Sequence, residues 1–193
     1  MAHNQAKMEV LDLREWARPA DLVERSVLWG LRGPVLEIGC GPGRLVAALT
    51  ESGTPALGID ISPFAAKLAA DRGVPMMVCS IFDRVPGEGQ WPTALLLDGS
   101  IGIGGDPTAL LCRVKAVLAA GGLALIETLG PGVVPGRAMA CVEYEPGVHE
   151  TIPWAKLGLD QLEEVAAHAG FALETVRRAG RRWFSWLRSN RVS

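Results

Sequence analysis

The chain has 193 residues, of which 49% are apolar and 21% are charged, and its formal net charge is -2. This composition suits one globular α/β domain with a substantial core and excludes a disordered chain. The small net charge gives no general attraction to nucleic acid or to an anionic membrane. No apolar run reaches the roughly 20 residues of a membrane-spanning helix, and residues 1–9 show no signal-peptide core.

The four cysteines are scattered along the chain and form no C-x-x-C pair; they are Cys40, Cys79, Cys112 and Cys141. The spacing therefore predicts neither a zinc site nor a disulfide framework, and it favours a reduced cytoplasmic setting. We expect no metal. Arginine far outnumbers lysine in the sequence, which favours a bacterial source with a GC-rich genome.

The N-terminal part predicts two short helices, over residues 10–16 and 21–31, with Pro19 between them. Next come a buried strand over 35–38 and three glycines at alternate positions, Gly39, Gly41 and Gly43. The strand is apolar on both faces apart from Glu37, as in a parallel sheet. The glycines predict a tight turn without Cβ atoms, so that a ligand can approach the backbone and the start of the following helix.

A second buried strand over 55–61 ends in Asp60, 21 positions after Gly39. An acidic residue at this distance reaches the ribose of a bound nucleotide from the neighbouring strand, and a carboxylate accepts both ribose hydroxyl protons. Alternatively, Asp60 caps the next helix. That interpretation is weaker, because Ser62 and Pro63 already supply a cap and a first-turn proline.

The pattern continues with a helix over 63–72 and with strands over 74–81, 94–97 and 123–128. The strand over 94–97 is followed by Asp98-Gly99-Ser100 and by a run that is rich in glycine up to residue 105. Ligands of open parallel sheets bind outside the carboxyl ends of the strands, so this run predicts backbone beside a ligand. The alternative is a bare flexible linker.

The segment 130–153 is rich in loop residues, with one strand expected around 140–144. A helix over 159–169 and closing strands over 171–176 and 182–188 complete the pattern. Six arginines fall between residues 177 and 191, with aromatic residues among them. An RNA-binding edge is conceivable, but alternation along a strand makes a solvated hairpin the simpler interpretation, and we do not expect a nucleic-acid partner.

The stretch E-x-G-x-G-x-G at residues 37–43 resembles motif I of the class I S-adenosylmethionine-dependent methyltransferases. It differs from the dinucleotide pattern G-x-G-x-x-G, because Arg44 stands where the third glycine should be. Residues 118–126 resemble the family's L-x-P-G-G-x strand signature, with Ala120 in place of proline. The resemblance covers roughly residues 20–188, and the stretches 97–107 and 182–184 look like a compact bacterial subgroup.

The resemblance implies an α/β Rossmann-like fold, with a seven-stranded, mostly parallel sheet, helices on both faces and a C-terminal antiparallel hairpin. It implies a single domain overall, in which residues 1–33 form N-terminal cap helices and residues 34–193 form the methyltransferase domain. Trp16 and Trp29 then either belong to the core or help to cap the cofactor cleft.

The resemblance also implies the cofactor-binding residues. Asp98 would bind the methionine amino group. Ser80 stands where the family has the aspartate that receives the adenine amino group, and Ile81 and Phe82 would flank the adenine ring unless they are simply core. The complete expected set is Glu37, Gly39, Gly41, Gly43, Asp60, Ile61, Ser80, Ile81, Phe82, Asp98, Gly99 and Ser100.

We expect an enzyme that transfers a methyl group from S-adenosyl-L-methionine to a small molecule by in-line displacement, with S-adenosyl-L-homocysteine as product. The sulfonium already carries the charge, so a base is needed only if the acceptor loses a proton. His149, with a suitable pKa, and Tyr144 are the catalytic candidates, although His149 is equally a surface histidine. Asp98 and Glu127 are further candidates.

Two alternatives remain from the sequence. A nicotinamide-dependent reductase is disfavoured by Arg44 and by a chain that leaves little room for a substrate domain, and NADH binding would revive it. A non-catalytic relative that only binds the cofactor is favoured by Ser80 and by the lack of an obvious base. Bound S-adenosylhomocysteine without transfer to any acceptor would support that relative.

Overall fold

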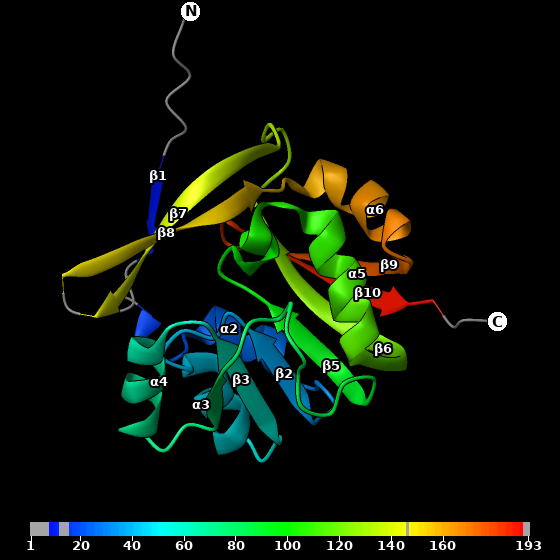
Figure 1. Ribbon diagram of the computed structural model, residues 1–193. Coiled ribbons are helices and arrows are strands. Elements are labelled where there is room, and N and C mark those ends of the chain that lie inside the picture. Colours follow the sequence, from blue (N-terminus) through cyan, green and yellow to red (C-terminus); the bar gives the residue numbers. More distant parts are fainter. Residues whose placement is uncertain (1–7, 12–15, 146, 191–193) are drawn as a thin grey trace, which may run out of the picture.

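The computed structural model describes residues 8–11, 16–145 and 147–190. Its main sheet has seven strands in the order β4-β3-β2-β5-β6-β10-β9 (Figure 1). The first five strands of this order are parallel, and β10 is antiparallel to both β6 and β9. The predicted fold class is therefore confirmed, including the closing hairpin. The strands are β2 (Val35–Ile38), β3 (Ala56–Asp60), β4 (Met76–Val78), β5 (Trp91–Leu96), β6 (Leu118–Thr128), β9 (Phe171–Ala179) and β10 (Arg182–Ser189).

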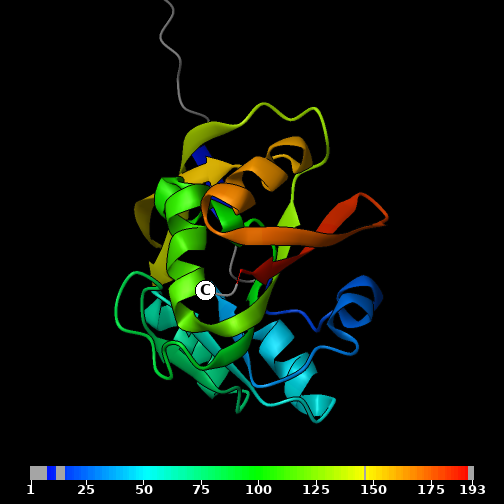
Figure 2. The same cartoon turned by 90° about the vertical axis from the view of Figure 1, so that its right-hand side faces the viewer.

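Helices cover both faces of this sheet, as Figure 2 shows. Residues of α2 (Leu22–Leu28) and α3 (Arg44–Glu51) pack in one cluster with alternate strand residues such as Val35 and Leu95. Residues of α5 (Pro107–Val117) and α6 (Leu159–His168) pack in the other cluster, with Leu36 and Leu96. Neighbouring residues of one strand thus enter opposite layers, which explains why the central strands are apolar throughout.

Local signals fix most helix starts where the sequence predicts them. Ser62 caps α4 (Pro63–Ala70) by accepting a hydrogen bond from the backbone of Ala65 at 3.1 Å. Asp106 caps α5 in the same way, at 3.0 Å from the nitrogen of Ala109. Both helices have proline in the first turn, which is favourable because that position needs no N–H partner.

A second sheet of three strands lies apart from the main one, in the order β1-β7-β8 (Figure 1). It consists of β1 (Met8–Leu11), β7 (Gly136–Glu145) and β8 (Val148–Lys156). The strand expected around 140–144 is present within β7, whereas β8 was not predicted. The helix expected over 10–16 is wrong at its start, where residues up to 11 are a strand; residues 12–15 lie outside the described part of the chain.

The carboxyl-terminal half of β8 packs on the turn after β5, which forms the 3-10 helix η1 (Ser100–Gly105). Ala155 and Trp154 approach Gly102 so closely that a Cβ there would overlap the Ala155 carbonyl oxygen. The small sheet is thereby held over the carboxyl ends of the main strands. Across the described ranges, no helix is long and apolar enough to cross a membrane.

Candidate functional site at the carboxyl ends of the strands

A first cavity lies where β2, β3 and β5 end, and six of the predicted cofactor residues line it. The main-sheet members of the lining are Gly39, Asp60, Ile61, Ser80, Ile81 and Ser100. Trp16, Val142, Ile152 and Trp154 line it from the N-terminal segment and the small sheet. The cavity is open to solvent on one side, and its volume is about 70 Å³.

Asp60 connects two turns at the floor of this cavity. Its Oδ2 accepts a hydrogen bond from the nitrogen of Gly41 at 2.8 Å, and its Oδ1 accepts one from the nitrogen of Ser62 at 2.9 Å. Burial raises the pKa of the Asp60 carboxyl, against the effect of these backbone donors. The residue that caps α4 is Ser62 and not Asp60, so the alternative interpretation of Asp60 is wrong, and its remaining lone pairs can accept further hydrogen bonds.

The residues after β4 divide between the cavity and the surface. Ser80 lines the cavity, and its Oγ accepts a hydrogen bond from the nitrogen of Phe82 at 3.2 Å. Ile81 is buried in the core and also lines the cavity, so both interpretations of it hold. Phe82 is 48% exposed and lies against Gly104. Ile81 therefore borders the space expected for an adenine ring, whereas Phe82 lies outside the cavity lining.

The glycines of the turn all have positive φ: 69° for Gly39, 51° for Gly41 and 77° for Gly43. A Cβ on Gly39 would lie 2.8 Å from Ile103 and 2.9 Å from the Oγ of Ser100. Packing around the turn leaves no room for a side chain at this position, and L residues are strained at such φ values. The turn is consequently held close to the η1 backbone.

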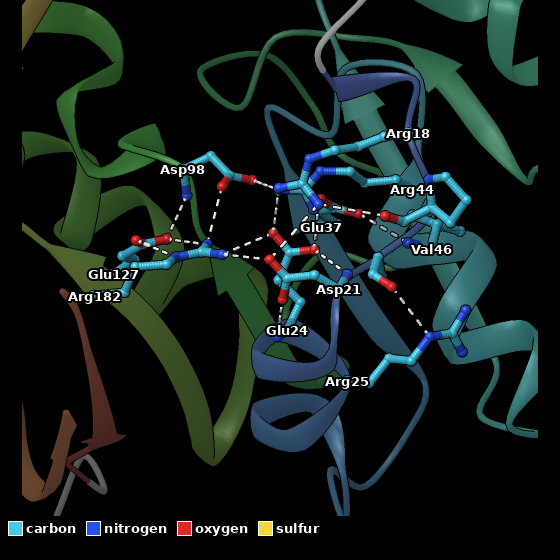
Figure 3. A network of polar contacts seen from close by, with 12 residues as sticks. Arg18, Asp21, Glu24, Arg25, Glu37, Arg44, Val46, Asp98, Glu127 and Arg182 are labelled. Atoms are coloured by element: carbon cyan, nitrogen blue, oxygen red, sulfur yellow. Dashed lines mark hydrogen bonds and ion pairs between the residues drawn. The ribbon is translucent and has the colours of Figure 1, made fainter. Parts of the chain in front are cut away.

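A buried network of ion pairs connects this turn to distant elements (Figure 3). Glu24 of α2 is fully buried, and its Oε1 lies 2.9 Å from Arg44 Nη2 and 2.8 Å from Arg182 Nη1. Arg44 also pairs with Asp98 Oδ2, and Arg182 Nη2 lies 3.0 Å from Asp98 Oδ1. Glu127 receives Arg182 Nε at 2.7 Å. Residues of α2, α3, β6 and β10 and of the turn after β5 therefore meet in one network of charges.

Asp98 occupies a special backbone position within this network. Its φ is 54°, the only positive value for a non-glycine residue among those the structure describes. Its backbone nitrogen donates to Glu127 Oε2 at 2.9 Å. Both carboxylate oxygens of Asp98 are paired with arginine, so its orientation is determined from both sides.

The expectation that the C-terminal arginines form a solvated face is wrong for Arg182. Burial disfavours its charge, yet the hydrogen bond and charge of Glu127, with Glu24 and Asp98, raise the pKa of Arg182. Neighbouring Arg181 lies in the turn before β10 and is exposed. Three residues of this network were not predicted from the sequence: Arg44, Glu24 and Arg182. The one sequence signal for them was an arginine at position 44, next to the apolar face of the following helix.

A second, smaller cavity adjoins the first and is lined by Trp16, Glu37, Gly39, Cys40, Arg44, Asp98 and Ser100. Only 2% of Arg44 is exposed, and its Nη1 has no hydrogen-bond partner in the described structure. A buried guanidinium nitrogen without a partner is costly.

Glu37 is buried beside this cavity, and its Oε2 accepts a hydrogen bond from the nitrogen of Val46 at 3.1 Å. Burial raises the pKa of Glu37 to about 8, while the charge of Arg44 opposes the rise. The carboxyl is therefore mostly protonated at neutral pH, and it adds little negative charge to the network.

We expect Glu37→Gln to change the pH dependence of stability. Between the ordinary pKa of 4.5 and the raised value of about 8, the native protein holds a proton that the unfolded chain releases. The free energy of unfolding of the wild type should therefore fall relative to the variant as pH rises through this window, by up to about 1.4 kcal/mol per pH unit. Urea unfolding of both proteins from pH 5 to 9 measures this difference. Parallel profiles would contradict the buried neutral carboxyl.

A third cavity, of about 300 Å³, opens where β5 and β6 end. It shares Asp98 with the second cavity and Trp154 with the first. Its other polar lining residues are Glu127, Thr128 and Lys156. Gly99, the residue that begins η1, lies on its wall.

The two catalytic candidates lie on the small sheet. His149 is exposed in β8, opposite Glu143 of β7, and it lines none of the three cavities formed by the described residues. Tyr144 belongs to β7, but its side chain lies outside the described part of the structure. Their catalytic roles stay predictions.

The strand order, with a ligand cavity over the glycine turn, defines the fold of the class I methyltransferases. The family model described as a methyltransferase domain matches residues 5–176. The chain belongs to this family, and it is a class I S-adenosylmethionine-dependent methyltransferase. This finding favours the first of the sequence hypotheses over a nicotinamide-dependent reductase.

Solved structures share the fold at low sequence identity. A Bacteroides fragilis S-adenosylmethionine-dependent methyltransferase, in complex with S-adenosyl-L-homocysteine, is 24% identical with a TM-score of 0.74, over 93% of this chain and 82% of its own. The 1,6-didemethyltoxoflavin-N1-methyltransferase of Burkholderia thailandensis is 19% identical with a TM-score of 0.64, over 88% and 77%. The CcbJ methyltransferase of Streptomyces caelestis is 18% identical with a TM-score of 0.66, over 93% and 90%. No curated protein matches the chain.

Proposed function

We propose that this enzyme methylates a small-molecule acceptor by in-line displacement, with the cofactor bound across the first and second cavities. The observation that carries the proposal is the convergence of Gly39, Asp60, Ser80 and Ser100 from four different strand ends on one cavity. The small-molecule substrate named for the Burkholderia neighbour supports the same class of acceptor.

In this proposal the adenosine part lies in the first cavity, and the methionine part in the second. Asp60 accepts hydrogen bonds from the ribose hydroxyls, and Ile61 and Ile81 border the adenine ring, with Ser80 as partner for its amino group. Arg44 and Asp98 both line the second cavity, where the guanidinium attracts the methionine carboxylate and the carboxylate attracts the amino group. An arginine paired with an aspartate is complementary to the two charges of an amino acid head.

We further propose that residues 1–33 act as a cap on the domain formed by residues 34–193. Trp16 supports a cap, because it lines both cofactor cavities. Trp29 is 86% exposed, so it belongs neither to the cap nor to the core. The unpaired state of all four cysteines supports a reduced cytoplasmic setting, and the excess of arginine supports a bacterial enzyme.

In the chemical step, a lone pair of the acceptor forms a bond to the methyl carbon from the side away from sulfur. The carbon–sulfur bond breaks, and its electron pair returns to sulfur to give the neutral thioether. An acceptor hydroxyl or amine then releases its proton to water. His149 as the base for this proton remains part of the proposal, but its exposed position outside the cavities does not support it.

We expect Asp60→Ala to weaken binding of S-adenosylmethionine and S-adenosylhomocysteine tenfold or more, at least about 1.4 kcal/mol, in calorimetric titrations. The affinity falls for two reasons: the variant lacks the ribose contacts, and it lacks the hydrogen bonds that Asp60 accepts from Gly41 and Ser62. The exposed Asp71→Ala is the matched control, with wild-type affinity. Failure of the wild type to bind either compound would contradict the proposal. Binding without methyl transfer to any small molecule would favour the non-catalytic relative.

A further inference from the structure

The turn after β4 carries two residues that line the first cavity, Ser80 and Ile81. It belongs to residues 79–90, which connect β4 to β5 as turns and irregular backbone. Within the turn, the nitrogen of Asp83 donates to the carbonyl oxygen of Ser80 at 3.0 Å. A segment without a helix or a strand ladder is easily displaced, so its position at the cavity depends on groups outside it.

Arg113, in the second half of α5, supplies such support. Its Nε donates to the carbonyl oxygen of Ile81 at 2.8 Å, and its Nη2 donates to that of Asp83 at 2.6 Å. One guanidinium thus bonds to two carbonyls of the same turn, and its planar fork fixes their relative position. Ile81 also packs in the same apolar cluster as Leu110 and Val114 of α5. The turn is therefore held on α5 by both polar and apolar contacts.

The guanidinium of Arg113 is itself held in place by Glu88. Glu88 Oε2 lies 2.8 Å from Arg113 Nη2, and Glu88 Oε1 accepts a second hydrogen bond from Nη1. These hydrogen bonds lower the pKa of Glu88 to about 2, so both groups are charged at neutral pH. Pairing at two points leaves the guanidinium little freedom to rotate away from the two carbonyls.

We propose that Arg113 is a positioning residue for cofactor recognition, which holds the turn after β4 so that the Ser80 hydroxyl meets the amino group of the adenine ring. This inference rests on the proposed function, in which Ser80 is the partner of that amino group. It adds a residue outside the site that determines how well the contact is made. Arg113 lines none of the three cavities formed by the described residues, so it acts through the turn.

The test measures what the adenine amino group contributes to binding. The probes are S-adenosylhomocysteine and its analogue with purine in place of adenine, which lacks only that amino group. Calorimetry with the full chain should give the wild type an affinity about fivefold higher for S-adenosylhomocysteine, the effect of one hydrogen bond. Ser80→Ala should lose this preference because the partner is gone. Arg113→Gln should lose it as well, although it leaves the lining of the cavity unchanged.

A double variant separates positioning from an independent effect. Ser80→Ala combined with Arg113→Gln should give the same ratio of affinities as either single variant, because both changes remove one contact. Arg84→Gln is the matched control, since it removes the same charge from an exposed position of the same segment, and it should keep the wild-type preference. A preference that survives Arg113→Gln, that falls further in the double variant, or that Arg84→Gln also removes would overturn the inference.

Hydrogen exchange supplies a readout that does not depend on the cofactor. In Arg113→Gln the amides of residues 80–84 should exchange at least tenfold faster, whereas those of β3 should keep the wild-type rate, because only the turn loses its support. Unchanged exchange in the turn, or equally faster exchange in β3, would overturn the inference.

The wild type distinguishes this inference from the proposed function. If it binds S-adenosylhomocysteine no better than the purine analogue, the inference alone is wrong. If it binds neither compound, the proposed function is wrong as well.

Discussion

Arg182→Met should lower the free energy of unfolding by about 3–5 kcal/mol, because its removal leaves Glu127 without an arginine partner and takes one arginine away from Glu24 and Asp98. Arg182 is the only contact that Glu127 Oε1 has in the network and one of two arginines that approach both Glu24 and Asp98. The guanidinium also lies over the ring of Phe184, at 5.1 Å from its centre. Urea unfolding at neutral pH measures the loss.

Arg181→Met is the matched control, since it removes the same charge from the preceding residue, which is exposed. Surface charges of this kind contribute at most about 1 kcal/mol. We also expect Arg182→Met to weaken S-adenosylhomocysteine binding, because Asp98 loses one of the two arginines that orient it. Equal free energies of unfolding for Arg182→Met and Arg181→Met would show that the charge network does not stabilise the fold.

Gly102→Ala should be the most disruptive glycine substitution beside the site, with a loss of about 2–3 kcal/mol in the free energy of unfolding. Its Cβ would overlap the carbonyl oxygen of Ala155 and lie 2.7 Å from the indole nitrogen of Trp154. A backbone oxygen cannot rotate away as a flexible side chain does, so β8 must move from η1. Because Trp154 lines two of the cavities, we expect weaker cofactor binding as well.

Gly136→Ala is the control for this substitution. Gly136 has no heavy atom within 4 Å of a built Cβ and lies at the start of β7 in the same small sheet. Its urea midpoint should stay within experimental error of the wild type. A Gly102→Ala variant with wild-type stability and affinity would mean that β8 is not fixed on η1 in solution.

Local sequence signals were sufficient for the main sheet and for one side of the site. The features that form the glycine turn lie within about 25 residues of one another: the apolar run at 35–38, the alternate glycines, and Asp60 at the end of the next strand. The turn depends only on backbone conformation and on the order of the strands. Ser62 and Asp106 cap their helices because each bonds a nitrogen three residues later. Such signals can be recognised in the sequence because the residues that interact are close together in the chain.

The tertiary structure alone decided the charge network and the third strand of the small sheet. Glu24 and Arg182 are 158 positions apart, and nothing in an exposed-looking arginine run distinguishes Arg182 from Arg181. The third strand of the small sheet, β8, carries mostly exposed side chains, so its sequence lacks the alternation that reveals a half-buried strand. It forms by pairing with β7. Burial and pairing are properties of residues brought together by the fold, and they depend on distances that sequence spacing does not contain.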